Sequence, residues 1–242
     1  MNPILLIPAR MSSTRLPGKP LADIGGAPMI VRVWRQAVAA NLGPVVVAAG
    51  EAAIVAAVAA AGGRAVLTDP DLASGSDRIW AALKAADPEG RHDMVVNLQG
   101  DLPALDPAQL TLVADALDRS GADIATLAAP IDKDADRANP AVVKAVVAWD
   151  ADERLGRALY FTRAAAPWGE GALWHHVGLY AFAREALESF VALPPSALEK
   201  RERLEQLRAL EAGMAIAVAR VDEAPLSVDT PDDLERARRI LT

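Results

Sequence analysis

The sequence predicts an α/β protein with a mostly parallel sheet, helices on both faces of that sheet, and an antiparallel excursion in its second half. Short apolar runs at 4–7, 45–49 and 94–98 suit strands that are buried on both faces. Helical segments separate these runs, and such alternation is typical of parallel sheets. After about residue 121 this alternation ends, and the sequence predicts strands connected by long irregular loops.

The first half alternates strand and helix. Between 28 and 40 the apolar residues share one helical face, which predicts the first helix. An Ala-rich helix at 51–61 is stopped by Gly62 and Gly63. The remaining expected elements of this half are a short strand at 65–67 and helices at 77–86 and 107–117.

The second half contains fewer helix signals, especially between 130 and 171. We expect strands at 124–129, 142–149, 174–182 and 216–221, and a charged helix at 198–212 with inward-facing leucines at 204, 207 and 210. A last helix should begin at Pro231, with Thr230 as its N-cap and Asp233 completing the capping pattern.

Composition excludes several classes of protein. The 242 residues allow one large domain or two small ones, and 52% hydrophobic residues provide for a sizeable core. The net charge of −7 and the absence of a long basic run argue against a general nucleic-acid binder. The absence of cysteine excludes disulfides and fits a reducing cytoplasm. We expect neither a signal peptide nor a membrane span.

A basic loop, PARMSSTRLPGKPL at 8–21, follows the first strand. Its prolines exclude a regular helix, and Arg10, Arg15 and Lys19 occur in it before the first acid, Asp23. Loops at this edge of open α/β sheets bind ligands, and Arg and Lys suit phosphate oxygens. The loop is therefore either a polyphosphate cradle or a solvated basic surface. It is not a Walker A loop, because Pro20 follows Lys19, and the chain has no G-x-G-x-x-G motif.

Two acids that lie next to predicted elements are candidate metal ligands. Asp101 lies just past the strand at 94–98, on the same sheet edge as the basic loop. Asp229 lies just before the last helix. A Mg²⁺ ion that bridges triphosphate oxygens needs one or two carboxylates. The alternatives are an Asp in a tight turn and a polar residue beside a helix cap.

The chain resembles the sugar-activating cytidylyltransferases, most closely those that activate 3-deoxy-manno-octulosonate (Kdo). Besides the basic loop, the motifs that carry the resemblance are SGSDRI (74–79), NLQGDLP (97–103), ALYFTRAAAPW (158–168), HHVGLYAF (175–182), LEQLR (204–208) and VDTPDDLERAR (228–238). They follow the family's order and cover essentially the whole chain.

The resemblance implies a three-layer α/β/α nucleotide-diphospho-sugar transferase-like (Rossmann-like) fold. It implies a single domain at 1–242, in which 1–120 mainly bind the nucleotide. Residues 121–242 then bind the sugar, mediate dimerisation and return to the core. The expected reaction is CTP plus Kdo giving CMP-Kdo and pyrophosphate, for lipopolysaccharide synthesis. Mg²⁺ is the implied cofactor and a cytoplasmic homodimer the implied assembly, with no nucleic-acid or membrane partner.

Site residues follow from matching the motifs. The expected catalytic residues are Arg10, Lys19 and Asp101, and the metal ligands are Asp101 and Asp229. Nucleotide binding is expected at Arg10, Arg15, Lys19, Ser74, Arg78 and Gln99. Sugar binding is expected at Gln99, Arg163, His176, Tyr180, Glu205 and Gln206.

Each of these positions also has a structural interpretation. Ser74 would cap the following helix, Gln99 would be a satisfied amide, and Glu205 and Gln206 would form a solvated helix face. Histidines 175 and 176 would point to opposite faces of a strand, so they could not bind one metal together. The sequence also departs from the family, with Leu102 where many members have Glu, and AAGE at 48–51 where relatives often read ATD.

Other functions remain open at this level. A cytidylyltransferase for sialate or for an amino-substituted Kdo would carry similar motifs. A catalytically silent CTP-binding module is the alternative from another class, although it would not need a complete pair of metal ligands.

Overall fold

The computed structural model describes residues 1–13 and 15–241, which divide into two compact units. Unit 1 comprises Met1–Thr111 and Pro225–Thr242, and unit 2 comprises Leu112–Ala224. The helix α4 (Pro107–Ser120) contains the first boundary between them. Strands and helices alternate in unit 1 and antiparallel strands dominate unit 2, so the predicted α/β class is confirmed.

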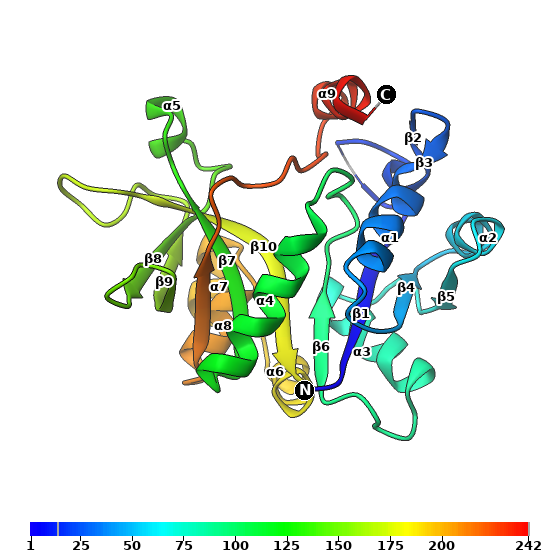
Figure 1. The fold of residues 1–242 in the computed structure, drawn as a ribbon, viewed down its shortest axis with the longest axis horizontal. Coiled ribbons are helices and arrows are strands. Elements are labelled where there is room, and N and C mark those ends of the chain that lie inside the picture. The colour runs from blue at the N-terminus through cyan, green and yellow to red at the C-terminus, as the bar shows by residue number, and fades with distance from the viewer. Residues whose placement is uncertain (14, 242) are drawn as a thin grey trace. The chain divides into compact units, whose positions relative to one another are not determined.

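Unit 1 is built on a parallel sheet with the strand order β5-β4-β1-β6 (Figure 1). Leu5 of β1 lies opposite Val45 of β4 on one side and Val96 of β6 on the other. The apolar run in β1 is almost completely buried, as expected for a central parallel strand. The bounds are Pro3–Ala9 for β1, Val45–Ala49 for β4, Arg64–Leu67 for β5 and Met94–Asn97 for β6.

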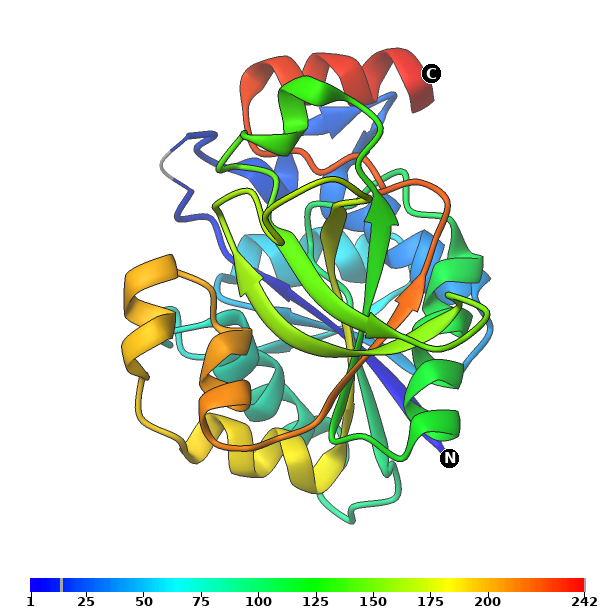
Figure 2. The same ribbon diagram turned by 90° about the vertical axis from the view of Figure 1, so that its left-hand side faces the viewer.

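Helices cover both faces of this sheet. The helices α1 (Met29–Ala39) and α2 (Ala52–Ala60) pack together on one face, and α3 (Gly75–Ala86) lies on the other (Figures 1 and 2). This arrangement follows from right-handed crossovers between parallel strands. The loops that follow β1, β4 and β6 therefore meet at one edge of the sheet.

The C-terminal segment completes unit 1. The helix α9 (Pro231–Leu241) packs beside the hairpin of β2 (Asp23–Ile24) and β3 (Ala27–Pro28), and its Leu234 shares a buried cluster with Ile24, Met29 and Val228. The predicted capping pattern is confirmed, because the Asp233 N–H donates to Thr230 Oγ1 at 3.2 Å while the Thr230 N–H donates to Asp233 Oδ2 at 2.9 Å. A short 3₁₀ turn, η1 (Lys19–Leu21), lies in the basic loop.

Unit 2 contains a mixed sheet with the strand order β10-β7-β11-β9-β8, and β8 pairs again with the start of β10. Its long curved strands are visible in Figure 2. Only β7 and β11 run in parallel; the other pairs are antiparallel, as the excursion predicts. The bounds are Ile124–Pro130 for β7, Lys144–Trp149 for β8, Leu155–Thr162 for β9, Trp174–Ala183 for β10 and Ile216–Arg220 for β11.

The predicted single helix at 198–212 is wrong. Two helices, α7 (Ala197–Glu202) and α8 (Gln206–Glu211), replace it, because Arg203 adopts a left-handed conformation (φ 57°, ψ 47°) that ends the first. Leu204 and Leu207 are nevertheless buried. In unit 2 the elements β9, α5 (Asp134–Arg137) and α6 (Arg184–Ala192) escaped prediction, and in unit 1 η1, β2 and β3 did. Among the described residues, no helix has the length and hydropathy needed to span a membrane.

Candidate active site

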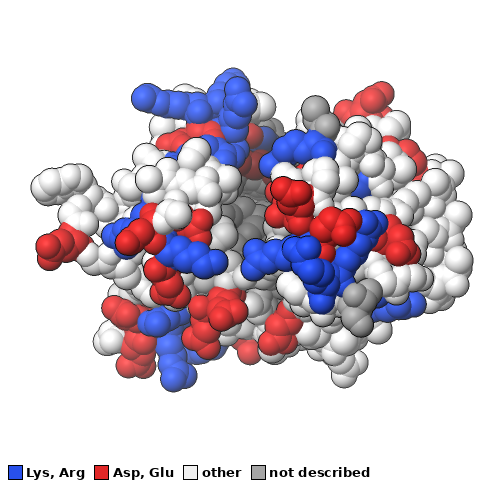
Figure 3. Space-filling view, turned by 90° about the horizontal axis from the view of Figure 1, so that it is seen from above, with Lys and Arg blue, Asp and Glu red and all other residues white. Residues whose placement is uncertain are grey.

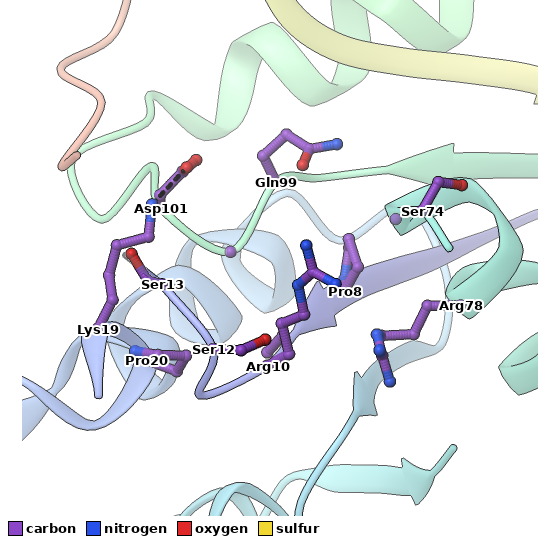
Figure 4. Close-up of a pocket in the computed structure, with 13 residues that line it drawn as sticks. Pro8, Arg10, Ser12, Ser13, Lys19, Pro20, Ser74, Arg78, Gln99 and Asp101 are labelled. Carbon is purple, nitrogen blue, oxygen red and sulfur yellow. Dashed lines mark hydrogen bonds and ion pairs between the residues drawn. The ribbon is translucent and has the colours of Figure 1, made fainter. Parts of the chain in front are cut away.

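A cavity of about 300 Å³ opens in unit 1 at the edge where the loops after β1 and β6 meet α3. It brings together six of the residues predicted to bind nucleotide or metal: Arg10, Lys19, Ser74, Arg78, Gln99 and Asp101. Figure 4 shows Lys19 and Asp101 at one end, Ser74 and Arg78 at the other, and Arg10 between them. The predicted clustering of the basic loop, the SGSDRI motif and the NLQGDLP motif is therefore observed.

Small residues also line the cavity. They are Gly75 of the SGSDRI motif, Gly100, and Ser12 and Ser13 of the basic loop, whose neighbour Thr14 lies outside the described residues. A Cβ atom on Gly100 would lie 2.7 Å from the Pro8 carbonyl oxygen, so any side chain here would push two strand ends apart. The signal was present in the NLQGDLP motif, where Leu98 and Gln99 separate the glycine from the buried strand β6.

The cavity ends in a chain of alternating charges. Lys19 Nζ lies 2.9 Å from Asp101 Oδ2 and 3.2 Å from Asp229 Oδ1, and Arg15 Nη2 lies 3.1 Å from Asp229 Oδ1. The Lys19 side chain is only 15% exposed. Burial alone lowers the pKa of this ammonium, but the two carboxylates outweigh burial and raise it above its ordinary value. Lys19 is therefore held as a cation.

Backbone contacts bring the two carboxylates to the same place although they are far apart in sequence. The Val228 N–H donates to the Asp101 carbonyl oxygen at 2.9 Å, which joins the segment before α9 to the loop after β6. The Asp229 N–H then donates to Asp233 Oδ2 at 3.2 Å, as part of the α9 cap. The capping pattern read from the sequence thus also fixes Asp229.

The donor set at this end of the cavity fits a hard divalent cation. Asp101 and Asp229 each place a carboxylate oxygen within hydrogen-bond distance of the same ammonium nitrogen, so both converge on one point. Two carboxylates suit Mg²⁺, which completes its shell with water and phosphate oxygens. The described residues contain no group of three or more acidic or histidine side chains that would form a closed protein site.

Arg78 is a buried, fixed cation at the other end of the cavity. Its guanidinium donates to Thr68 Oγ1 at 2.6 Å and to the carbonyl oxygens of Asp69 and Pro70, both at 3.0 Å. Burial lowers the pKa of Arg78, and the neighbouring charge of Arg10 lowers it further. Its hydrogen bonds order the 68–70 segment, while its charge contributes to the potential inside the cavity.

Ser74 has the structural role that the sequence allowed. Its Oγ accepts from the Asp77 N–H at 3.1 Å and caps α3, which directs the start of that helix toward the cavity. Free N–H groups at a helix start favour anions, so the cap also suits a phosphate site. Gln99 Nε2 lies 3.4 Å from Asn97 Oδ1. The predicted nucleotide contacts of both residues stay predictions.

The predicted sugar residues other than Gln99 lie in unit 2. His176 on β10 is buried, with Nε2 3.0 Å from Thr126 Oγ1 and Nδ1 3.4 Å from the Gln206 amide nitrogen. The Thr126 hydroxyl has one proton, and it is shared between the carbonyl oxygens of Val177 and Leu179 at 3.0 and 2.9 Å. The tautomer with its proton on Nε2 satisfies all of these partners, because Nε2 then donates to Thr126 Oγ1 and Nδ1 accepts from Gln206.

Burial keeps His176 neutral. It lowers the pKa of the imidazole to about 3, with the neighbouring His175 adding to the effect. The ring makes an edge contact with Phe161, at a centroid distance of 4.8 Å, and lies 5.6 Å from the Tyr180 ring. Burial, together with the charge of Glu205, raises the pKa of Tyr180. These side chains form one polar cluster inside unit 2.

Arg163 holds the end of α7. Its guanidinium donates to the carbonyl oxygens of Glu202 at 2.8 Å, Pro140 at 2.9 Å and Arg203 at 3.3 Å. These contacts satisfy carbonyl groups at a helix C-terminus and support the left-handed Arg203. The expected contact of Arg163 with a sugar carboxylate would have to use its remaining N–H groups, and it stays a prediction.

The two sequence departures have clear structural settings. Leu102 is buried, so the position that is Glu in many relatives here contributes to the core. Gly50 of the AAGE segment faces the arginines, because a Cβ atom there would lie 3.1 Å from Arg78 Nη1 and 3.3 Å from Arg10 Cβ.

Comparison with known proteins gives a consistent result. A family model for cytidylyltransferases matches residues 4–216. The chain is 65% identical over 240 residues to the 3-deoxy-manno-octulosonate cytidylyltransferase of Parvibaculum lavamentivorans, covering 99% of this chain and 93% of the relative. The same identity and coverage relate it to the enzyme of that name from Rhodospirillum centenum.

A solved structure agrees with this match. It is described as CMP:2-keto-3-deoxy-manno-octonic acid synthetase in complex with CTP, and it superposes with a TM-score of 0.89 at 36% identity. The alignment covers 99% of this chain and 98% of that one. The resemblance noted from the motifs is thereby confirmed, and the chain belongs to the cytidylyltransferase family.

Proposed function

We propose that this chain transfers CMP from CTP to Kdo and releases pyrophosphate. The observation that carries the proposal is the unit 1 cavity. The cations Arg10, Lys19 and Arg78 line it together with the carboxylate of Asp101, which is ion-paired with Lys19. Relatives 65% identical over nearly the whole chain carry the name of this activity, and the structural neighbour was solved with CTP.

In the proposed reaction the anomeric hydroxyl oxygen of Kdo bonds to the α-phosphorus of CTP. The bond from that phosphorus to the bridging oxygen breaks, pyrophosphate takes the electron pair, and the hydroxyl proton passes to solvent. Such chemistry depends mainly on positioning and on charge stabilisation. Arg10 and Lys19 hold the triphosphate and stabilise the charge that builds on the leaving group, with Arg15 at the rim.

The same proposal includes Mg²⁺ as the cofactor, held by Asp101 and Asp229. The bound ion would supply Lewis acidity that polarises the phosphate and lowers the pKa of the attacking hydroxyl. The two aspartates would hold the ion through their carboxylate oxygens, and Lys19, which lies beside both, would contact phosphate oxygens. Ser74 and Gln99 contact the nucleotide in this scheme, and Gln99 also contacts the sugar.

Sugar selection is proposed for unit 2, at Arg163, His176, Tyr180, Glu205 and Gln206. Support comes from the clustering of His176 with Gln206 and Tyr180, and from the position of these residues in the matched motifs. A site that hydrogen-bonds its substrate rejects analogues strongly, because its buried partners are then left unpaired. Glu205→Gln should therefore raise the KM for Kdo while CTP binding without sugar stays unchanged.

The test is pyrophosphate release with CTP and Mg²⁺ in the presence of Kdo, 8-amino-Kdo, sialate or no sugar. Turnover that is fastest with Kdo supports the proposal. Faster turnover with sialate or the amino sugar would reassign the sugar, and CTP binding without pyrophosphate release under any condition would identify a silent binding module.

Four further expectations belong to this proposal. A homodimer and a role in lipopolysaccharide synthesis are supported by the family resemblance, and a cytoplasmic location fits the absence of cysteine. Small substrates rather than nucleic acid are favoured by the net charge of −7. The face in Figure 3 agrees, because Lys and Arg there are interspersed with Asp and Glu.

A further inference from the structure

Glu51 makes a long-range contact with the start of the basic loop. Its Oε2 accepts a hydrogen bond from the Met11 N–H at 2.9 Å, across 40 residues of sequence. Met11 directly follows Arg10, so the bonded amide belongs to the peptide that joins these two residues. The contact therefore fixes the backbone on the C-terminal side of Arg10.

This is not the contact that the local sequence favours. Glu51 occupies the N-cap position of α2, where a side-chain oxygen usually accepts from an N–H in the first helical turn. Glu51 makes no such capping bond. Its carboxylate instead reaches across to the loop after β1, and α2 starts without a side-chain cap.

The residue before Glu51 holds the other side of Arg10. The Gly50 N–H donates to the Ala9 carbonyl oxygen at 2.8 Å, and a Cβ atom on Gly50 would come within 3.3 Å of Arg10 Cβ. Residues 50 and 51 thus contact the chain on both sides of one cavity arginine. Without a side chain at 50, the backbone of this segment approaches Arg10 closely.

Charge supports the same placement. Arg10 and Arg78 line the cavity together, and the charge of Arg10 lowers the pKa of Arg78 after the larger effect of burial. The Glu51 carboxylate acts in the opposite direction and is the first of the acids that raise this pKa. The Glu51 carboxylate therefore favours the charged form of Arg78, next to the segment that it holds by its hydrogen bond.

We propose that Glu51 is a positioning residue that holds Arg10 in the geometry needed for the triphosphate, acting through its hydrogen bond to the Met11 amide. This inference rests on the proposed function, because it needs CTP as the ligand of the cavity. The proposal also assigns a role to the AAGE segment, because its last residue is Glu51, which contacts the basic loop at Met11.

Three variants separate the hydrogen bond from the charge. Glu51→Gln keeps the side-chain length and an acceptor oxygen but loses the negative charge. Glu51→Asp keeps the charge, but its side chain is one methylene shorter and does not reach the Met11 amide. Glu51→Ala loses the charge and the acceptor. CTP affinity is measured by calorimetry, and exchange of the Met11 amide proton is measured without nucleotide. Glu188→Ala, an exposed acid in unit 2, is the control.

We expect Glu51→Asp and Glu51→Ala to weaken CTP binding about tenfold, or about 1.4 kcal/mol, and to speed Met11 exchange. Glu51→Gln should retain near-normal affinity and protection. The inference would be overturned if Glu51→Gln weakened CTP binding as much as Glu51→Ala does. Normal CTP affinity of Glu51→Asp and Glu51→Ala would overturn it too. Failure of the wild-type chain to bind CTP would instead overturn the proposed function, while the exchange result would still report on the contact.

Discussion

Lys19 Nζ donates to Asp101 Oδ2 at 2.9 Å, so a cation expected to bind phosphate and an acid expected to bind metal are ion-paired with each other. Each neutralises the other while the substrate is absent. A triphosphate with its metal brings both partners that this pair lacks, an anion for the lysine and a cation for the carboxylate. Binding of the triphosphate and its metal can therefore replace the ion pair between Lys19 and Asp101 without leaving either side chain unpaired.

The first prediction concerns Lys19. Lys19→Ala should weaken CTP binding about 10- to 100-fold, because a charged hydrogen bond to phosphate contributes about 1.5–3 kcal/mol. Arg15→Ala is the matched control, since Arg15 also pairs with Asp229 but its side chain is 63% exposed and should contribute much less. Calorimetry with CTP measures both. Equal losses in the two variants would show that total charge, rather than the buried lysine, controls affinity.

The second prediction concerns the two aspartates. Asp101→Asn and Asp229→Asn should each reduce turnover at least about 100-fold, since loss of a ligand disturbs both metal binding and the electrostatics of the reaction. Mn²⁺ binding, followed by electron paramagnetic resonance in the presence of CTP, should fall in parallel. Unfolding curves check that the fold is retained. Near-normal turnover of both variants at limiting Mg²⁺ would rule out the shared metal site.

The third prediction is a stability difference between two ion pairs. Arg208 and Glu199 form a buried two-pronged pair in unit 2, with side chains that are 9% and 13% exposed. Glu199→Gln should cost about 3 kcal/mol of unfolding free energy, because the buried guanidinium then keeps only the Glu205 carboxylate, 4.0 Å away, as its counter-charge. Glu235→Gln breaks the exposed pair with Arg238 and should cost less than about 1 kcal/mol. Urea unfolding that gave equal costs would contradict this assignment.

The fourth prediction is a pH dependence that arises from His176. Burial lowers its folded-state pKa to about 3, so between its ordinary value of 6.5 and about 3 the unfolded chain binds a proton that the folded chain does not. The contribution of His176 to the free energy of unfolding is therefore fully present above pH 6.5. It declines by up to about 1.4 kcal/mol per pH unit as the pH falls from 6.5 to about 3.

The matching experiment compares unfolding free energies at several pH values from 7 down to 4. His176→Gln, which cannot titrate there, should be less stable at pH 7 and should show a shallower loss toward acid. Parallel slopes for wild type and His176→Gln would contradict this prediction, because they would mean that folding does not change the proton affinity of His176.

The parts of the fold that sequence predicted best are those where a local pattern decides the structure. The apolar run of β1 is buried on both faces, and the Thr230–Asp233 cap needs only neighbouring residues. The expected helix at 198–212 failed for the opposite reason. Its interruption at Arg203 is supported by the guanidinium of Arg163, which lies just past the end of β9, and no local pattern reveals that contact.

The candidate site shows the same division. Arg10, Lys19 and Asp101 were predictable together because each follows a strand of one parallel sheet, and the topology alone brings them to one edge. The role of Glu51 was not predictable, since its position favours a local cap and its actual partner lies 40 residues away. Gly100 carried a visible signal, but the Pro8 backbone that requires it does not appear in the motif.

Unit 1 is made from two stretches of chain that flank unit 2, and this has a consequence during synthesis. The ribosome makes Lys19 and Asp101 before unit 2, but it makes Asp229 and the helix that supports it only after unit 2. A nascent chain that stops within unit 2 can therefore form the parallel sheet and the basic loop without a complete pair of acids. Fragments of this kind should lack activity even when they still attract nucleotide.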